Sequence, residues 1–123
     1  MTEKTTKKIG KRNLPAEIRL AVKAAQAKMG EGIRVLDLRE LSAFTDFFVI
    51  MNGNSSRHNA ALLEAVEDEL RASGVRPLSV EGRGSADWGL LDYGFFLVHV
   101  FSGTARDHYS LEKLWGDAPK IEY

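Results

Sequence analysis

Residues 95–101 form an apolar run in which both alternating sets of side chains are bulky. A strand of this kind is typical of the middle of a sheet that helices cover on both faces. The pattern therefore predicts a central strand over residues 95–101. One set comprises Phe95, Leu97, His99 and Phe101, and the other comprises Phe96, Val98 and Val100.

A second strand is predicted just before this run. It begins at Trp88 and ends at the turn signal Asp92-Tyr93-Gly94, so the two strands are expected to form a hairpin. Because side chains alternate along a strand, Trp88, Leu90 and Asp92 should lie on one face of the sheet.

The other elements follow from apolar spacing and from turn and capping residues. Helical spacing predicts helices from Pro15 to Gly30, from Ser55 to Gly74, and from the capping box Thr104/Asp107 to Trp115. Branched and aromatic residues predict strands over residues 33–38, 47–51 and 77–81. The order α-β-β-α-β-β-β-α indicates one α/β domain, with a mixed sheet of about five strands flanked by helices.

Charge is distributed unevenly along the chain. Residues 1–12 carry five basic residues and one acidic residue, whereas the rest of the chain carries 12 basic and 16 acidic residues. Together with the scarcity of apolar residues, this predicts a disordered basic arm over residues 1–12 and a folded domain over residues 13–123. The arm could contact phosphate weakly and in a salt-sensitive way, or it could be a solubilising tail.

The composition also bears on location. The chain has no cysteine, which excludes disulfides and thiolate metal sites and suits a cytoplasmic protein. No apolar run approaches the roughly 20 residues that span a bilayer, and the polar start does not resemble a signal peptide. We therefore expect no membrane association.

Three histidines are the first candidates for chemistry. No two of His58, His99 and His108 have the close spacing that places metal ligands on one face of an element. His99 lies among aromatic residues in the central strand, which favours a buried, hydrogen-bonded core histidine over a catalytic base. His58 falls in the first turn of a helix, where capping or partner contact is the simpler role.

The carboxylates give little support for an enzyme. Asp37, Asp46, Asp87 and Asp92 could in principle hold magnesium, but phosphoryl transfer requires two of them close together on a strand. No such pair lies on a predicted strand. We therefore expect no catalytic residues, no metal and no cofactor.

Two further features have alternative interpretations. The segment Gly53-Asn54-Ser55-Ser56-Arg57 could be an anion site at a helix start, or an ordinary capped helix. Trp88, between a Gly/Ser loop and a turn, could be an interface anchor or a core residue, and Tyr93 has the same ambiguity. Tyr109 and Trp115 are expected to pack inside the domain.

Taken in order, these segments resemble the ribosomal silencing factor, or Iojap-like, family over residues 15–118. The first signature is Thr45-Asp46-Phe47-Phe48-Val49-Ile50 with Gly53-Asn54-Ser55-Ser56-Arg57-His58. The second comprises Glu81-Gly82, Asp87-Trp88, Leu91-Asp92-Tyr93-Gly94, Val98-His99-Val100-Phe101, Arg106, Tyr109 and Leu111-Glu112-Lys113-Leu114-Trp115. The chain departs from the family at two positions. Gly89 stands where the family usually has a branched aliphatic residue, which predicts a loosened strand or a bulge. Phe95 stands where an acidic residue is common, which predicts an apolar contact in place of a charge contact.

The resemblance implies a nucleotidyltransferase-like fold that has lost its catalytic residues. It also implies binding to universal ribosomal protein fourteen of the large subunit, which blocks a bridge to the small subunit and represses translation. The family's surface patch falls here on Trp88, Asp92 and Tyr93, with Glu81, Gly82 and Asp87 beside it.

Two rival functions remain open from the sequence. One is a nucleotide- or phosphate-transferring enzyme on the same fold, and the other is an RNA-binding module that uses the basic arm. The missing carboxylate pair disfavours the enzyme, and the near-neutral body disfavours the RNA-binding module. Either a monomer or a homodimer is compatible with the sequence.

Overall fold

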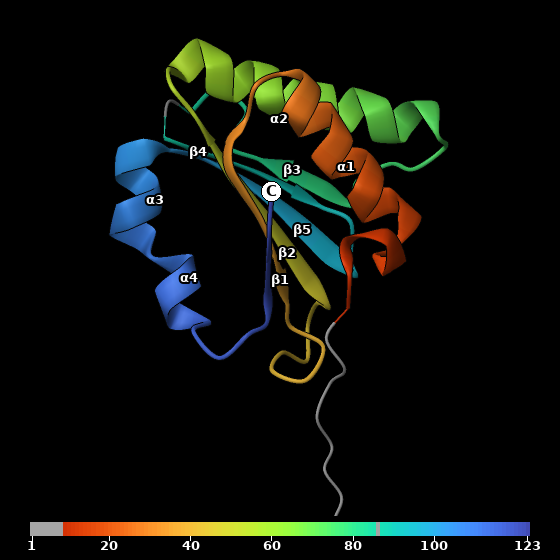
Figure 1. Cartoon of the computed structure of the whole chain (residues 1–123). Coiled ribbons are helices and arrows are strands. Elements are labelled where there is room, and N and C mark those ends of the chain that lie inside the picture. Colours follow the sequence, from red (N-terminus) through yellow and green to blue (C-terminus); the bar gives the residue numbers. More distant parts are fainter. Residues whose placement is uncertain (1–8, 86) are drawn as a thin grey trace, which may run out of the picture.

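The computed structural model describes residues 9–85 and 87–123, which form a mixed sheet with helices on both faces (Figure 1). A short 3₁₀ helix, Lys11–Asn13, comes first. The elements that follow are α1 (Ala16–Ala27), β1 (Glu31–Asp37), β2 (Phe47–Gly53), α2 (Ser56–Ala72), β3 (Ser79–Glu81), β4 (Trp88–Asp92), β5 (Phe96–Ser102), α3 (Gly103–Tyr109), α4 (Leu111–Leu114) and β6 (Lys120–Glu122).

The strand order is β3-β4-β5-β2-β1-β6, and the pairing of β2 with β5 is parallel while the other pairs are antiparallel. The predicted central strand is confirmed, because β5 lies between β4 and β2 and is buried from Phe96 to Phe101. The hairpin of β4 and β5 is confirmed as well. Gly89 pairs in regular register with Val100, so the irregularity expected there is absent.

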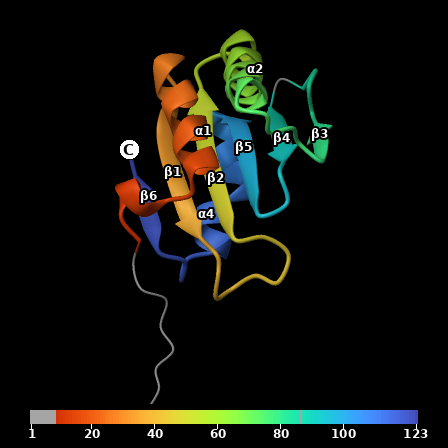
Figure 2. The same cartoon turned by 90° about the vertical axis from the view of Figure 1, so that its right-hand side faces the viewer.

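Helices α1 and α2 cover one face of the sheet, and α3 and α4 lie on the other (Figures 1 and 2). The first face packs the larger core, into which α1 contributes Ile18 and Val22 and α2 contributes Leu62 and Val66. The second face packs a smaller core that includes Leu36, Phe48, Ile50, Leu90, Leu97 and Phe101, with Trp88, Leu111 and Trp115 against it.

Three details differ from the sequence-based expectation. A sixth strand, β6, pairs with β1, although its three residues carry no strong strand pattern. The last helix is two helices, because Ser110 adopts φ 51° and breaks the run. Its cap is Ser102 rather than Thr104, since the Ser102 side chain accepts a hydrogen bond from the backbone N–H of Ala105.

The basic arm was expected over residues 1–12, and residues 1–8 of it lie outside the described residues. From residue 9 onward the chain is placed against the domain, and Ile9 packs on the larger core. None of the helices in residues 9–85 and 87–123 is long and apolar enough to cross a membrane.

Candidate functional site

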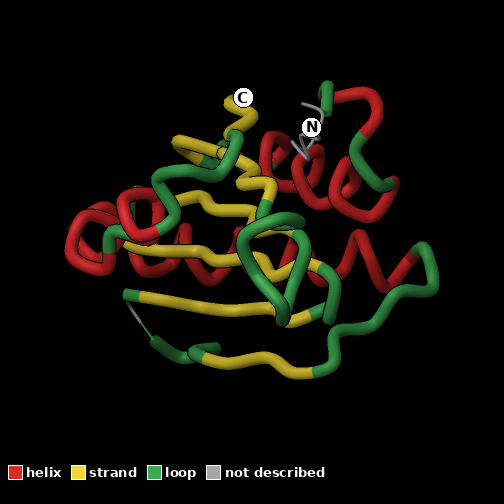
Figure 3. Tube along the Cα trace, turned by 90° about the horizontal axis from the view of Figure 1, so that it is seen from below, coloured by secondary structure: helices red, strands yellow, loops and turns green. Residues whose placement is uncertain are grey.

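The candidate site lies on the second face of the sheet, over strands β3 and β4. Seen from below, α3 and α4 stand over one end of the sheet and leave much of these two strands without a helix (Figure 3). The strand register places Trp88 opposite Phe101, Leu90 opposite both His99 and Glu81, and Asp92 opposite Leu97. The expectation that Trp88, Leu90 and Asp92 share a face is therefore confirmed. We call this region the Trp88 face. Glu81, Trp88 and Asp92 are its exposed or partly exposed residues, and Leu90 and Leu97 are buried beneath them.

A hollow of about 230 Å³ opens at the end of this face where Trp88 lies. Its lining comes from β4, β5 and the turn between α3 and α4, namely Trp88, His99, Phe101, Tyr109 and Leu111. Tyr109 stands at its edge with its ring centroid 5.7 Å from that of Phe101. It was expected to pack inside, but its side chain is 55% exposed because the helix ends there. The hollow is thus walled mainly by aromatic rings.

His99 is the polar residue of this hollow, and it is buried as predicted. Its ring lies edge-on to Phe48 at 4.6 Å and stacks with Phe101 at 5.8 Å between centroids. The expected hydrogen bond is absent, since neither ring nitrogen has a partner among the described residues. Burial lowers the pKa of His99 to about 4, so the imidazole is neutral at pH 7. Leaving a buried polar group unpaired costs free energy, so the ring of His99 is an unusual feature of this core.

Three carboxylates surround the Trp88 face. Asp92 is half-buried and accepts the Gly94 backbone N–H at 2.8 Å, which fixes the β4–β5 turn. Asp87 accepts the Ser102 hydroxyl at 3.3 Å, and Glu81 is exposed on the edge strand. Among the described residues none of the three forms an ion pair. The rim is therefore negatively charged and free to meet a cation.

Gly82 has a structural role beneath this rim. It adopts φ +73°, and a β-carbon there would collide with the carbonyl group of Trp88. Only glycine lets the loop after β3 pass this close to β4 at a positive φ. Gly82 therefore shapes the border of the face rather than offering it a side chain.

Tyr93, which was expected in the patch, lies on the other side of the sheet from the Trp88 face. The residue follows Asp92 and so points to the opposite side of the sheet, where its ring stacks on Phe96 at 4.8 Å and 9° between planes. It is 8% exposed within the larger core. Burial raises the pKa of its hydroxyl to about 12.

An ionic cluster fixes α3 and α4 beside the hollow. The Arg106 guanidinium donates to Glu112 at 2.9 and 3.1 Å and to the Asn52 side chain at 2.8 Å. Arg34 on β1 donates to the same Glu112 carboxylate. The hydrogen bond from Arg106 is the main cause that lowers the pKa of Glu112. These contacts tie the short helices to the sheet and hold Tyr109 and Leu111 in place.

The other candidate sites are not assembled. Asp37 is buried at the end of β1 in an ion pair with Arg39 at 2.7 Å. Asp92 ends β4 and Asp87 precedes it, and β2 and β5 lie between β1 and β4. At the start of α2 the Ser55 side chain accepts from the His58 N–H, and the Asn54 N–H donates to the His58 ring at 3.0 Å. Ser55 therefore caps the helix, as expected for an ordinary capped helix, and the Asn54 amide is already bonded within the segment. Within residues 9–85 and 87–123 no group of three or more histidine or acidic residues is placed to hold a metal ion.

Comparison with known proteins identifies the family. Residues 11–123 match the family described as "Ribosomal silencing factor during starvation". The chain belongs to the ribosomal silencing factor family. It is 37% identical over 107 residues to the ribosomal silencing factor of Bacillus subtilis strain 168, which covers 87% of this chain and 91% of that protein.

The fold agrees with this family. A crystal structure of a Chromobacterium violaceum protein matches with a TM-score of 0.79 and 34% identity, over 81% of this chain and 83% of that one. A more distant relative is the mouse protein named "Mitochondrial assembly of ribosomal large subunit protein 1", 29% identical over 80% of this chain and 45% of that protein. Members of the ribosomal silencing factor family are ribosome-associated regulators, and this chain shares their architecture.

Proposed function

We propose that this protein binds the large ribosomal subunit through universal ribosomal protein fourteen and sterically blocks association with the small subunit. The observation that carries the proposal is the Trp88 face, a largely helix-free sheet surface with an aromatic anchor and an acidic rim. Large aromatic side chains next to a partly filled hollow are typical of the residues that dominate binding energy. Ribosomal proteins are mostly basic partners, for which Glu81, Asp87 and Asp92 supply complementary charge.

The proposed mechanism is exclusion rather than catalysis. A domain seated on the subunit interface occupies the volume that a bridge to the small subunit would need, and no covalent step is required. The alternative is a nucleotide- or phosphate-transferring enzyme that uses Asp37, Asp46 or Asp92. Its support is weak, since Asp37 is neutralised by Arg39 and Asp92 is engaged in the turn.

The site places further expectations on the protein. Action on ribosomes implies a cytoplasmic location, and the face can act in a monomer or in a homodimer that leaves it free. The basic arm, residues 1–12, is proposed to add a weak contact with ribosomal RNA at low salt.

The test is sedimentation of purified ribosomal subunits with the native chain, Trp88→Ala and Asp92→Asn. The native chain should keep the subunits apart, while both variants should let them join. Truncation of an anchor at a buried contact typically costs about 2 kcal/mol or more, a loss in affinity of roughly 30-fold. Asp92→Asn removes the charge and retains an oxygen that can accept the Gly94 N–H.

Met29→Ala serves as the control, because Met29 is 75% exposed at the end of α1 on the other side of the sheet. It should behave like the native chain. Circular dichroism must show that Trp88→Ala is folded, since Trp88 also packs on the smaller core. Folded variants that still prevent joining would show that this face is not the docking site.

A further inference from the structure

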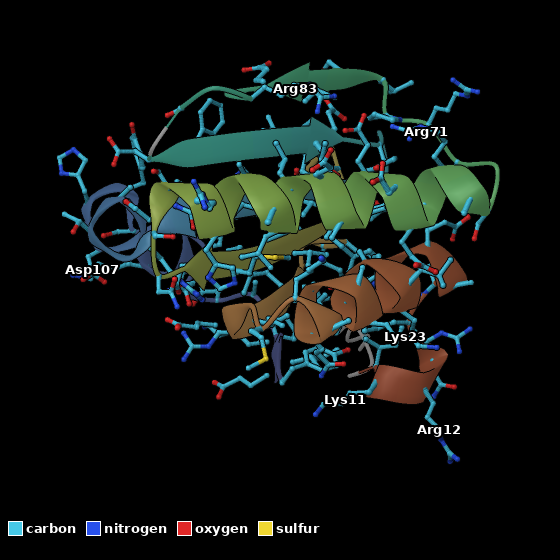
Figure 4. All side chains as sticks on the ribbon, turned by 90° about the horizontal axis from the view of Figure 1, so that it is seen from above. Lys11, Arg12, Lys23, Arg71, Arg83 and Asp107 are labelled. Atoms are coloured by element: carbon cyan, nitrogen blue, oxygen red, sulfur yellow. The ribbon has the colours of Figure 1, made fainter. Side chains whose placement is uncertain are left out.

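A basic groove lies on the α1 side of the molecule, away from the Trp88 face. It is a hollow of about 520 Å³ between the 3₁₀ helix, α1 and the last residue of the chain. Four of its lining side chains are cationic and none is a carboxylate: Lys11, Arg12, Arg19 and Lys23, with Val22, Gln26 and Tyr123 between them. Figure 4 shows Lys11, Arg12 and Lys23 gathered beside α1.

The cations of this groove are held in position without being neutralised. The Arg19 Nε donates to the Leu14 carbonyl at 3.1 Å, which leaves the two terminal nitrogens of the guanidinium free to bind. The Lys11 ammonium lies 4.5 Å from the centre of the Tyr123 ring. Arg19, Lys23 and Gln26 are spaced so that they share one face of α1.

The groove gathers four basic side chains that have no ion-pair partner among the described residues. Arg34, Arg39, Arg71, Arg83 and Arg106 are all in ion pairs. Among those same residues, no ion pair includes a cation of the groove. In a chain with formal net charge zero, four unpaired cations around one hollow form a local positive potential.

We infer that this groove binds the phosphate backbone of RNA. Four cationic side chains on one concave surface, with no acidic side chain among them, are typical of a nucleic-acid contact. Lys4, Lys7 and Lys8 precede the groove in the sequence and extend the same charge along the chain. The inference adds to the proposed function a second contact that does not depend on the Trp88 face. Because α1 covers the opposite side of the sheet, both surfaces are available to the ribosome at once (Figure 1).

The test is the salt dependence of binding to a short fluorescein-labelled RNA hairpin, followed by fluorescence anisotropy with the full chain. Contacts from the groove to about four phosphates predict a slope of log affinity against log salt of about −3 to −4. In Arg12→Glu/Lys23→Glu two of these contacts are lost, so the slope should become shallower by about two. The control variant Arg76→Glu/Lys113→Glu makes the same change in net charge at two exposed positions outside the groove.

The inference holds if the salt dependence of the groove variant becomes shallower by about two while that of the control variant stays as in the native chain. Equal losses in the two variants would overturn it, because the effect would then come from net charge alone. Absence of binding at low salt would also overturn it, as would groove-dependent binding to phosphatidylglycerol vesicles without binding to RNA.

Trp88→Ala separates this inference from the proposed function. It should bind the hairpin as the native chain does, because Trp88 lies on the other side of the sheet. Loss of subunit exclusion with normal RNA binding would support two separate surfaces. A Trp88→Ala chain that no longer binds the hairpin would contradict the assignment of RNA to the α1 side.

Discussion

Replacing His99 by leucine is expected to stabilise the protein. Both ring nitrogens are buried without a partner among the described residues, and His99 is 7% exposed. Leaving a buried polar group unpaired costs about 1–3 kcal/mol. Leucine removes that group and keeps apolar contact with Phe48 and Phe101. We therefore expect His99→Leu to raise the free energy of unfolding at pH 7 by about 1 kcal/mol.

The advantage of the variant should grow as the pH falls. In the unfolded chain His99 gains its proton near pH 6.5, whereas burial lowers its pKa in the folded protein to about 4. Between these values the unfolded state binds more protons, so the stability of the native protein falls with falling pH. At about 1.4 kcal/mol per pKa unit, the native protein should lose about 2 kcal/mol between pH 7 and pH 5 through this residue. The free energy of unfolding of His99→Leu should therefore exceed that of the native protein by about 3 kcal/mol at pH 5.

The measurement is urea denaturation followed by tryptophan fluorescence at pH 7 and pH 5. His108→Leu is the matched control, because His108 is exposed on α3 and its loss should not reproduce the effect. A His99→Leu chain that is less stable than the native one at pH 7, or that has the same pH dependence, would refute the reasoning. Subunit joining by the stabilised variant then tests whether the imidazole serves the partner.

Two further predictions concern side chains around the candidate site. Glu112→Gln should lower the free energy of unfolding by about 1–2 kcal/mol in urea at pH 7, because Arg106 loses its charged partner. The native pKa of Glu112 is lowered, so this contribution should begin to fall near the unperturbed value of 4.5 and be lost as the pH falls through the lower native pKa. Tyr93→Phe should leave subunit joining unchanged and keep or raise the melting temperature, because the hydroxyl is buried and unpaired on the opposite sheet face. A loss of subunit exclusion in folded Tyr93→Phe would restore Tyr93 to the docking surface.

The hairpin was predictable because its evidence is local. Alternation along residues 88–92 and 95–101 is visible in the sequence and fixes which side chains share a face. The same rule, continued by one residue, sends Tyr93 away from Trp88. The resemblance to the family placed both residues in one patch, whereas the structure places their side chains on opposite sides of the sheet.

What sequence reasoning missed depends on contacts between distant segments. Strand β6 has a single apolar residue, Ile121, and exists because β1 offers a free edge. The hollow at His99 requires the helix to break at Ser110, so that Tyr109 and Leu111 come to the sheet from two short helices. A stripe of apolar positions cannot show that break, because both parts retain helical spacing.

The candidate site results from incomplete cover of the sheet. Helix α2 has 17 residues and, with α1, closes the first face, whereas α3 and α4 have seven and four residues and reach only one end of the second. A sheet face left open normally carries polar side chains, yet here it presents Trp88 and a buried, unpaired His99. When the replacement of a residue would make the isolated domain more stable, that residue is expected to belong to a functional site. The proposed partner would complete this cover, bury the open face and meet the acidic rim with complementary charge.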